Sequence, residues 1–560
     1  MKKFFIITAI LIFSAQSAAY ASFTPTKPKP PRSKEMLAMG KEIYFERCSY
    51  CHGMEGGGDG PVAEFLDPRP RNFKTNTFKF RSTESGALPL DEDLFLTISR
   101  GVQGTAMQVF DKDLIKTGLT EEQRWAVIYW IQTFREMPDF SLWDMDFEAC
   151  ASDDPDMKED CRDAKIVKIG DGPPASPELI AKGKEVYKKA KCFQCHGDRG
   201  LGNGVSVPGM KDDWKFPIVP RDLTKGWKYK AGTTVKEIFS RFTTGLNGTP
   251  MPSFAGSISE EDRWAIAHFV KSLIYKPKQK LELQVKKIEG KLPETADDPA
   301  WEQADQIDVW LTGNVLIKPR WQNIKIDMVH VKALFNEEEI VFRMEWHDRF
   351  ADTVHEGHNN MYQTDKTKPG ETGNTQTYVP IYDTTKYNPG KYRDGLMLQF
   401  PVKIPVGQTK PHFLNGSSGN PVNLWWWRAD YDKDPSKGRP VLEMNASGFK
   451  KPFKIQPDDS QEVTHKAEFN DGIWTLVMKR KRFTENKRDV KFVAGKFIPI
   501  AVNAWDGFNK DIGMQKSIST WYFVYLEKPM EMKVYLIALG AIVLVGASEV
   551  FLMRKWNSVD

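Results

Sequence analysis

The sequence predicts a multidomain protein in which two all-α domains are followed by an all-β sandwich and one C-terminal transmembrane helix. Three observations lead to this fold class. The first half of the 560-residue chain contains two copies of one pattern, each about 110 to 120 residues long. The second half has short alternating segments separated by Gly, Asn, Asp and Pro clusters. A 20-residue apolar stretch lies near the C-terminus.

Residues 1–21 have the features of a secretory signal peptide. Lys2 and Lys3 precede an apolar run, and small residues allow cleavage after Ala21. The apolar run is too short to span a bilayer, so an uncleaved anchor is the weaker interpretation. We therefore expect the bulk of the chain to lie on the periplasmic, extracytoplasmic side of the membrane.

Two pentads in the first half have the Cys-x-x-Cys-His pattern that attaches c-type haem. They are Cys48-Ser-Tyr-Cys51-His52 and Cys192-Phe-Gln-Cys195-His196. The two thiols of such a motif add across the haem vinyl groups, and the histidine becomes the proximal iron ligand. Two copies among only 6 Cys and 9 His make a zinc knuckle or a redox dithiol a poor alternative. We predict two covalently bound haem c groups.

Each motif histidine is followed 55 residues later by a methionine, Met107 in the first copy and Met251 in the second. A methionine thioether opposite the histidine fills the second axial position and raises the haem potential. Packing in the core is the alternative role for each methionine. Because a six-coordinate iron has no open position for a substrate, we predict two low-spin haems that transfer electrons.

The residues around the two motifs repeat as well. We predict a helix over 34–47 before the first motif and a helix over 177–191 before the second. A closing helix begins near Thr120, where Thr-Glu-Glu-Gln is a capping box, and its counterpart begins near Ser259 with a weaker cap. Each closing helix carries a tryptophan on its apolar face.

This pattern resembles the class I cytochrome c family over residues 33–136 and 176–275. In that family the motif histidine is the proximal ligand, and a methionine in the loop before the last helix is the distal ligand. The resemblance therefore implies the pairs His52 with Met107 and His196 with Met251.

Two arginines occupy matching places in the copies, Arg71 after Pro70 and Arg221 after Pro220. A guanidinium at this place can pair with a haem propionate, and the neighbouring proline would fix the loop. An ordinary surface arginine is the alternative.

Residues 137–175 form an acidic linker between the two copies. The two cysteines that are not in haem motifs, Cys150 and Cys161, lie in it. In an oxidising compartment they can close a short disulfide, and free thiols are the alternative.

Several phrases of the second half resemble the haem b subunit family of ethylbenzene dehydrogenase over residues 292–527. That family includes the γ subunits of dimethylsulfide dehydrogenase, selenate reductase and chlorate reductase, and related subunits of nitrite oxidoreductases. The phrases are Asp298-Pro-Ala-Trp301, Glu345-Trp-His-Asp348, Gln399-Phe-Pro401, Pro421-Val-Asn-Leu-Trp425, Ala504-Trp-Asp-Gly507 and Gly513-Met-Gln-Lys516-Ser-Ile-Ser519-Thr-Trp521.

The resemblance implies one haem b held by a methionine and a lysine. Lys516 matches the lysine position, and such a ligand must be a neutral amine. The phrase before Pro421, where the methionine is expected, contains none. Three interpretations stay open: His412 is the second ligand, Met397 from a neighbouring strand is the ligand, or the haem site is altered or lost.

Residues 534–553 are long enough to cross a bilayer once as a helix. Arg554 and Lys555 follow the stretch, which places the short C-terminal tail in the cytoplasm, although Lys528 and Lys533 before it weaken this signal. We therefore expect a single-pass protein of the cell membrane.

The formal net charge is only +5, and basic residues are interspersed with acidic ones, which excludes a nucleic-acid partner. The resemblance implies the electron-transfer subunit of a molybdenum oxidoreductase, most similar in architecture to a nitrite oxidoreductase γ subunit. Its partners would be iron-sulfur and molybdenum-cofactor subunits and a soluble cytochrome or membrane electron carrier. The alternative is a dihaem cytochrome c with a carbohydrate-binding module that donates electrons to an oxidase.

Overall fold

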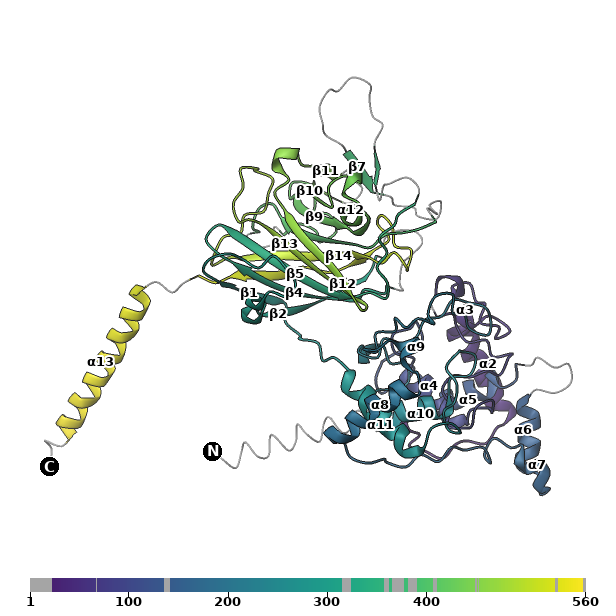
Figure 1. Cartoon of the computed structure of the whole chain (residues 1–560). Helices are drawn as coiled ribbons and strands as arrows, with labels where there is room; N and C mark the ends of the chain where they lie inside the picture. The colour runs from purple at the N-terminus through teal and green to yellow at the C-terminus, as the bar shows by residue number, and fades with distance from the viewer. Residues whose placement is uncertain are drawn as a thin grey trace. The chain divides into compact units, whose positions relative to one another are not determined.

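The computed structural model describes residues 23–66, 68–134, 142–314, 324–356, 362–364, 377–380, 390–405, 410–448, 451, 453–528 and 532–556. The predicted signal peptide, residues 1–21, lies outside them. The chain forms two compact units, of which the first extends to Pro277 and the second begins at Lys278 (Figure 1).

The first unit contains the two predicted helical copies. The first copy consists of α2 (Lys34–Arg47), α3 (Ser49–His52), η2 (Ala63–Phe65), α4 (Asp91–Arg100) and α5 (Glu121–Ile131). The second consists of α8 (Pro177–Lys189), α9 (Phe193–His196), η3 (Gly226–Lys228), α10 (Val235–Thr244) and α11 (Glu260–Leu273). Thr120 closes the predicted capping box with Gln123, whereas Ser259 caps α11 through its own side chain.

A glycine sets the crossing of the first and last helix in each copy. A Cβ at Gly40 of α2 would lie 2.0 Å from the carbonyl oxygen of Ala126, and a Cβ at Gly183 of α8 would lie 2.0 Å from that of Ala265. Both obstructing atoms belong to the backbone, so no side chain can move aside. The two helices of each pair therefore approach as closely as glycine allows.

Replacing Gly183 with alanine is expected to destabilise the second copy by about 3 kcal/mol, because α8 and α11 must separate. The gain of roughly 1 kcal/mol from a better helix former is too small to offset this cost. Thermal unfolding of the full chain measures the effect. Gly256→Ala is the control, since a Cβ there meets nothing within 4 Å. Equal stability of the two variants would contradict the close helix crossing.

The predicted acidic linker, residues 137–175, is not merely a connection. Its described part contains α6 (Leu142–Ala151) and α7 (Pro155–Glu159). Trp143 of α6 is buried in the core of the first copy, where its ring lies 6.2 Å from that of Phe78. The acidic composition conceals this apolar anchor, which is why the sequence indicated only a linker.

The second unit is built from sixteen strands in the described residues. They are β1 (Glu282–Lys287), β2 (Gln306–Trp310), β3 (Thr312–Gly313), β4 (Met328–Phe335), β5 (Glu339–His347), β6 (Tyr362–Thr364), β7 (Thr377–Pro380), β8 (Gly395–Pro401), β9 (Val422–Arg428), β10 (Val441–Ala446), β11 (Phe453–Ile455), β12 (Thr464–Asn470), β13 (Ile473–Lys481), β14 (Phe497–Trp505), β15 (Ser517–Ile518) and β16 (Tyr522–Leu526). Short helices lie between some of them: η4 (Pro299–Gln303), α12 (Ala429–Lys433), η5 (Pro435–Lys437) and η6 (Asp458–Ser460).

These strands form two layers that pack face to face. The main order is β12-β13-β5-β4-β1-β16-β14-β8-β9-β10-β11-β7-β6. Aromatic rings of β5 and β13 meet those of β9, since Trp427 lies 6.0 Å from Trp346 and 5.0 Å from Trp474 between ring centroids. The β-domain thus has its core between the layers, as the alternating sequence pattern predicts.

Strand β1 begins ten residues before the predicted domain start at residue 292. It pairs in parallel with both β4 and β16 and so links the two layers. Its own sequence alternates, with Leu283 and Val285 buried. The resemblance could not reach this strand, because its first phrase begins at Asp298.

The Trp425-Trp426-Trp427 run packs on both faces of its sheet. Trp425 and Trp427 belong to the core between the layers, whereas Trp426 lies on the opposite face with Met397 and Trp505. This opposite face, formed by β8, β9, β10 and β14, is called the outer face below.

The C-terminal segment forms α13 (Met532–Trp556). Within the ranges that the structure describes, no helix meets the length and hydropathy required to cross a bilayer. The membrane span over residues 534–553 therefore stays a prediction.

Candidate haem sites

The first copy encloses an apolar cavity of about 400 Å³. Both thiols of the first motif line it, and so do His52 and Met107. The spacing of 55 residues along the chain thus becomes a juxtaposition in one cavity. This is the donor set that a covalently attached haem with histidine and methionine ligands needs.

The imidazole of His52 is oriented by its neighbours. Its Nδ1 lies 2.9 Å from the carbonyl oxygen of Arg71, and its ring stacks on Phe73 with 4.5 Å between centroids. Donation from Nδ1 to a carbonyl leaves the lone pair of Nε2 available for a metal. Burial lowers the pKa of His52 to about 4, so the ring is neutral.

A hydroxyl-anchored turn presents Met107. The amide of Met107 donates to Oγ1 of Thr105 at 3.1 Å, and that hydroxyl donates to the carbonyl of Val102 at 2.7 Å. The amide of Val102 in turn donates to the carbonyl of Met107 at 2.9 Å. The backbone of the predicted distal ligand is therefore fixed on both sides.

The second copy repeats this construction. Nδ1 of His196 lies 3.1 Å from the carbonyl oxygen of Arg221. The amide of Met251 donates to Oγ1 of Thr249 at 3.2 Å, and the amide of Leu246 donates to the carbonyl of Met251 at 3.1 Å. Burial lowers the pKa of His196 as well. Because the histidine and the methionine are held in the same way at both sites, the two sites suit the same cofactor.

The matched arginines orient the histidines through their backbone, a role that the sequence did not reveal. The guanidinium of Arg71 lies over the ring of Trp214 at 4.6 Å, and Arg71 also lines the first cavity. Four further basic residues that sequence reasoning missed line this cavity: Arg47, Arg69, Lys79 and Lys230. Lys230 belongs to the second copy, so the first cavity is completed across the interface between the copies.

Arg81 joins the first copy to the methionine loop of the second. Its side chain is fully buried and donates to the carbonyls of Thr244 and Gly245, where the loop leading to Met251 begins. Its Nε donates to the carbonyl of Glu84 at 3.0 Å. The position of the second distal ligand thus depends on a residue of the first copy.

Arg81→Ala is expected to destabilise the interface by roughly 2–4 kcal/mol, because two buried carbonyls lose a charged donor. We also expect the potential of the second haem to shift more than that of the first, since the start of the Met251 loop loses two hydrogen bonds, whereas the first copy loses only the one at Glu84. Thermal unfolding and a potentiometric titration measure these effects. Arg81→Lys, which retains one charged donor, should recover part of each. Equal shifts at both haems would contradict this role.

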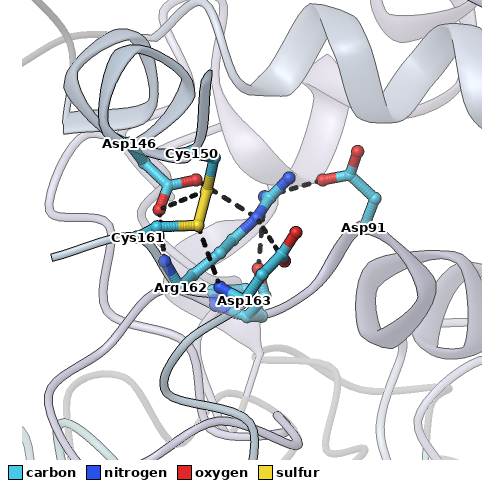
Figure 2. Close-up of a disulfide and its surroundings, with 7 residues drawn as sticks. Asp91, Asp146, Cys150, Cys161, Arg162 and Asp163 are labelled. Atoms are coloured by element: carbon cyan, nitrogen blue, oxygen red, sulfur yellow. Dashed lines mark hydrogen bonds and ion pairs between the residues drawn. A yellow bond between two sulfur atoms is a disulfide. The ribbon is translucent and has the colours of Figure 1, made fainter. Parts of the chain in front are cut away.

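The structure joins Cys150 and Cys161 in a disulfide that clasps α6 and the following segment (Figure 2). Beside it, Nη1 of Arg162 lies 2.8 Å from Asp91 Oδ1 and its Nε lies 3.1 Å from Asp146 Oδ2. Asp91 is the first residue of α4, so the clasp is tied directly to the first copy. These cysteines are therefore structural.

Lys516 is a lysine in the interior of the β-domain. Its side chain is completely buried, and its Nζ has no hydrogen-bond partner among the described residues. The amine lies 4.8 Å from the ring centroid of Trp505. Burial lowers the pKa of Lys516 to about 7. A buried amine without a partner that loses its proton easily fits a lysine that ligates haem iron.

The turn before Pro421, where we expected a methionine, lies against the loop of Lys516. Asn415 Nδ2 is 3.7 Å from Met514 Sδ, and Trp521 Nε1 donates to the carbonyl of Pro411 at 2.7 Å. His412 in this turn is exposed, and its Nδ1 accepts the amide of Leu414 at 3.0 Å.

Met397 is completely buried on the outer face. It lies opposite Asn503 of β14, two residues before Trp505. Met444 of β10 is equally buried in the same cluster and was not predicted as a candidate. The alternation along β8 and β10 could have identified both, had the position of the outer face been known.

Three family models match the chain. Residues 37–135 match cytochrome c, residues 178–270 match cytochrome c oxidase, cbb3-type, subunit III, and residues 298–439 match ethylbenzene dehydrogenase.

Several curated proteins are similar to parts of the chain. The chain is 24% identical over 230 residues to a protein described as respiratory nitrate reductase heme subunit ORF7 from Haloferax mediterranei, covering 41% of this chain and 67% of that protein. It is 28% identical over 137 residues to chlorate reductase subunit gamma from Ideonella dechloratans, covering 24% of this chain and 52% of the relative. It is 26% identical over 140 residues to dimethylsulfide dehydrogenase subunit gamma from Rhodovulum sulfidophilum, covering 24% of this chain and 48% of that protein. The chain thus spans about half the length of the two gamma subunits.

Two solved structures also align with parts of the chain. A chain of the Kuenenia stuttgartiensis reducing HAO-like protein complex is 40% identical, with 44% of this chain and 99% of that chain covered and a TM-score of 0.36. A carbohydrate binding module of family 9 from Caldicellulosiruptor kristjanssonii is 7% identical, with 45% and 98% covered and a TM-score of 0.21. Scores this low carry no conclusion about function.

Each matched range falls within one of the structural divisions described above. The first two cover the copies that contain the histidine and methionine pairs, which implies covalently bound haem c. The third covers the part of the β-domain from η4 to η5. The chain therefore combines two cytochrome c domains with an ethylbenzene dehydrogenase-like domain, and it is similar to the gamma subunits of chlorate reductase and dimethylsulfide dehydrogenase.

Proposed function

We propose that this chain is a membrane-anchored, periplasmic, multihaem electron-transfer subunit of a molybdenum oxidoreductase, of the nitrite oxidoreductase γ-subunit type. The observation that carries the proposal is the repeated site with a thiol pair, a neutral oriented histidine and a fixed methionine. Such a site leaves no iron position for a substrate. The chain relays electrons, and the bond chemistry belongs to partner subunits.

Bound haem supplies reversible one-electron chemistry at each site. The chain holds it through Cys48 and Cys51 in the first domain and through Cys192 and Cys195 in the second. The carbonyls of Arg71 and Arg221 hold the proton on Nδ1 of each histidine. Most of the lining of the first cavity is apolar, which limits reorganisation of the surroundings when the charge changes.

In the β-domain we assign Lys516 as one ligand of a haem b. Its buried, partnerless amine supports the assignment, and the similarity to gamma subunits agrees with it. Between the candidates for the second ligand, burial on the outer face favours Met397, whereas His412 is exposed.

The relatives also support the proposed partners. Their names describe subunits of reductases and a dehydrogenase, so this chain would dock on iron-sulfur and molybdenum-cofactor subunits. A soluble cytochrome or a membrane carrier would exchange electrons with its cytochrome c domains. The anchor would be α13, whose side chains from Leu536 to Leu552 include ten exposed large hydrophobic residues.

A carbohydrate-binding role for the β-domain has less support. Such a module stacks sugars on exposed aromatic rings. The tryptophans of β5, β9, β13 and β14 are all buried, and the exposed rings in the described part of the domain are the scattered Phe483, Phe497 and Phe508. No described contact of the β-domain favours a sugar over a haem.

Carbon monoxide binding tests the relay function. We expect the fully reduced protein to show no spectral change with carbon monoxide, because the histidine and the methionine at each cytochrome c site would both hold the iron. Purification from the native membrane should also recover molybdenum and iron-sulfur subunits with the chain. Carbon monoxide binding by a stoichiometric fraction of the c-type haem would contradict the proposal.

A further inference from the structure

Three buried carboxylates meet at strand ends of the β-domain. Asp348 follows β5, Asp394 precedes β8 and Asp506 follows β14. They are 5%, 0% and 2% exposed, and one carboxylate oxygen from each lies within 4.8 Å of the others. Asp348 and Asp506 belong to two of the phrases noted in the sequence, and the electron-transfer role does not use either.

The surrounding hydrogen bonds satisfy only part of the cluster. Asp394 accepts from Trp474 Nε1 at 3.0 Å, from the amide of Gly507 at 2.8 Å and from the amide of Asp352 at 2.7 Å. Oδ2 of Asp348, although buried, has no hydrogen-bond partner in the described part of the chain. This free oxygen belongs to one of the three carboxylates that converge.

Burial and neighbouring carboxylates both disfavour ionisation of this cluster. Burial, and then repulsion from neighbouring carboxylates, raises the pKa of Asp348 and of Asp394. Asp352, which is next to the cluster, has its pKa raised to about 7 by burial and by Asp506. Arg349 and Lys325 offset part of the charge, and they act on Asp506. A bound cation would give the unpartnered Oδ2 of Asp348 a partner among the converging carboxylates.

We propose that Asp348, Asp394 and Asp506 bind a calcium ion. The convergent donors are all carboxylate oxygens, which suit hard cations and disfavour zinc and copper. Calcium accepts several carboxylates in flexible geometry, whereas magnesium usually keeps several waters and only one or two carboxylates. Three carboxylates in a buried cluster therefore favour calcium.

The ion would fix the loop that carries Lys516. This loop starts at Asp506, whose amide donates to Asp511 Oδ2 at 3.0 Å and whose Oδ1 accepts the amide of Asn509 at 2.9 Å. Calcium bound at Asp506 would connect the start of this loop to the end of β5 and the beginning of β8. The effect on haem b rests on the function proposed above, but the calcium site itself does not.

The test measures calcium on the full-length holoprotein. We expect about one calcium per chain by elemental analysis after gel filtration, its loss on dialysis against EGTA, and a lower melting temperature that added Ca²⁺ restores. Asp348→Asn and Asp506→Asn should weaken Ca²⁺ binding on the order of 100-fold. The control is Asp430→Asn, because Asp430 is equally buried but paired with Arg393 at 2.9 Å. It should retain the calcium.

Two results would overturn the site: no stoichiometric calcium in the wild-type protein, or unchanged calcium in both Asn variants. The EGTA experiment on the wild type decides the question even where a variant fails to fold. Calcium with no haem b would leave the site standing and refute the haem b assignment. Haem b without calcium would refute the calcium site and leave the haem b assignment standing.

Discussion

Replacing Met251 with histidine is expected to lower the midpoint potential of the second haem c by on the order of 0.2 V, a part of the roughly 0.8 V range that axial ligands span. A thioether stabilises ferrous iron, and a second imidazole does so less. The loop that holds Met251 is fixed by Thr249 and Leu246, so the new side chain starts from the same backbone. The first haem should keep its potential.

A potentiometric titration followed in the haem c absorption bands measures both potentials. Met107→His should produce the same shift at the first haem, which assigns each potential to its domain. Met54→His is the matched control, because Met54 lies beside the first motif but is 66% exposed. If Met251→His left both potentials in place, Met251 would not be an iron ligand.

Replacing Lys516 with leucine is expected to abolish haem b and leave both c-type haems intact. The covalent haems depend on the first unit, whereas Lys516 belongs to the second. The free energy of unfolding of the haem b-free β-domain should rise by about 1–3 kcal/mol, because a buried amine without a partner is removed. A loss of cofactor together with a gain in stability separates ligation from a structural role.

The measurement combines b-band and c-band absorbance with denaturant unfolding. Lys479→Leu serves as the control, since Lys479 lies on β13 and pairs with Glu294 at 3.0 Å. It should retain haem b. Full haem b in the Lys516→Leu protein would exclude Lys516 as ligand.

The sequence predicted the cytochrome c domains well because their chemistry is local. Covalent attachment needs two thiols and a histidine within five residues, and the duplication provides a second example of every feature. The capping box at Thr120 and the buried tryptophans of α5 and α11 were predictable for the same reason. Local rules of helix termination and amphipathicity determine them.

Features that depend on contacts across long chain separations were missed. Arg81 reaches carbonyls more than 160 residues away, and Lys230 of the second copy lines the cavity of the first. The anchor at Trp143 and the early strand β1 also acquire meaning only from their neighbours. The hydrophobic periodicity of a sequence gives no information about such contacts.

The β-domain was predicted less completely than the cytochrome c domains, but one of its site residues was found from the sequence. A phrase-level resemblance identified Lys516, and the structure places it in a buried position that suits a ligand. The second ligand could not be chosen from sequence, because Met397 and His412 differ mainly in burial, which depends on how the sheet folds. The carboxylate cluster escaped notice because its members are separated by more than 40 residues along the chain.

The number and type of haems per chain test the central claim most directly. A pyridine haemochrome spectrum of the purified full-length protein, combined with protein quantitation, counts them. We expect two haem c and one haem b per chain. Two haem c and no haem b would contradict the haem b site at Lys516, and fewer than two haem c would contradict the duplicated electron relay itself.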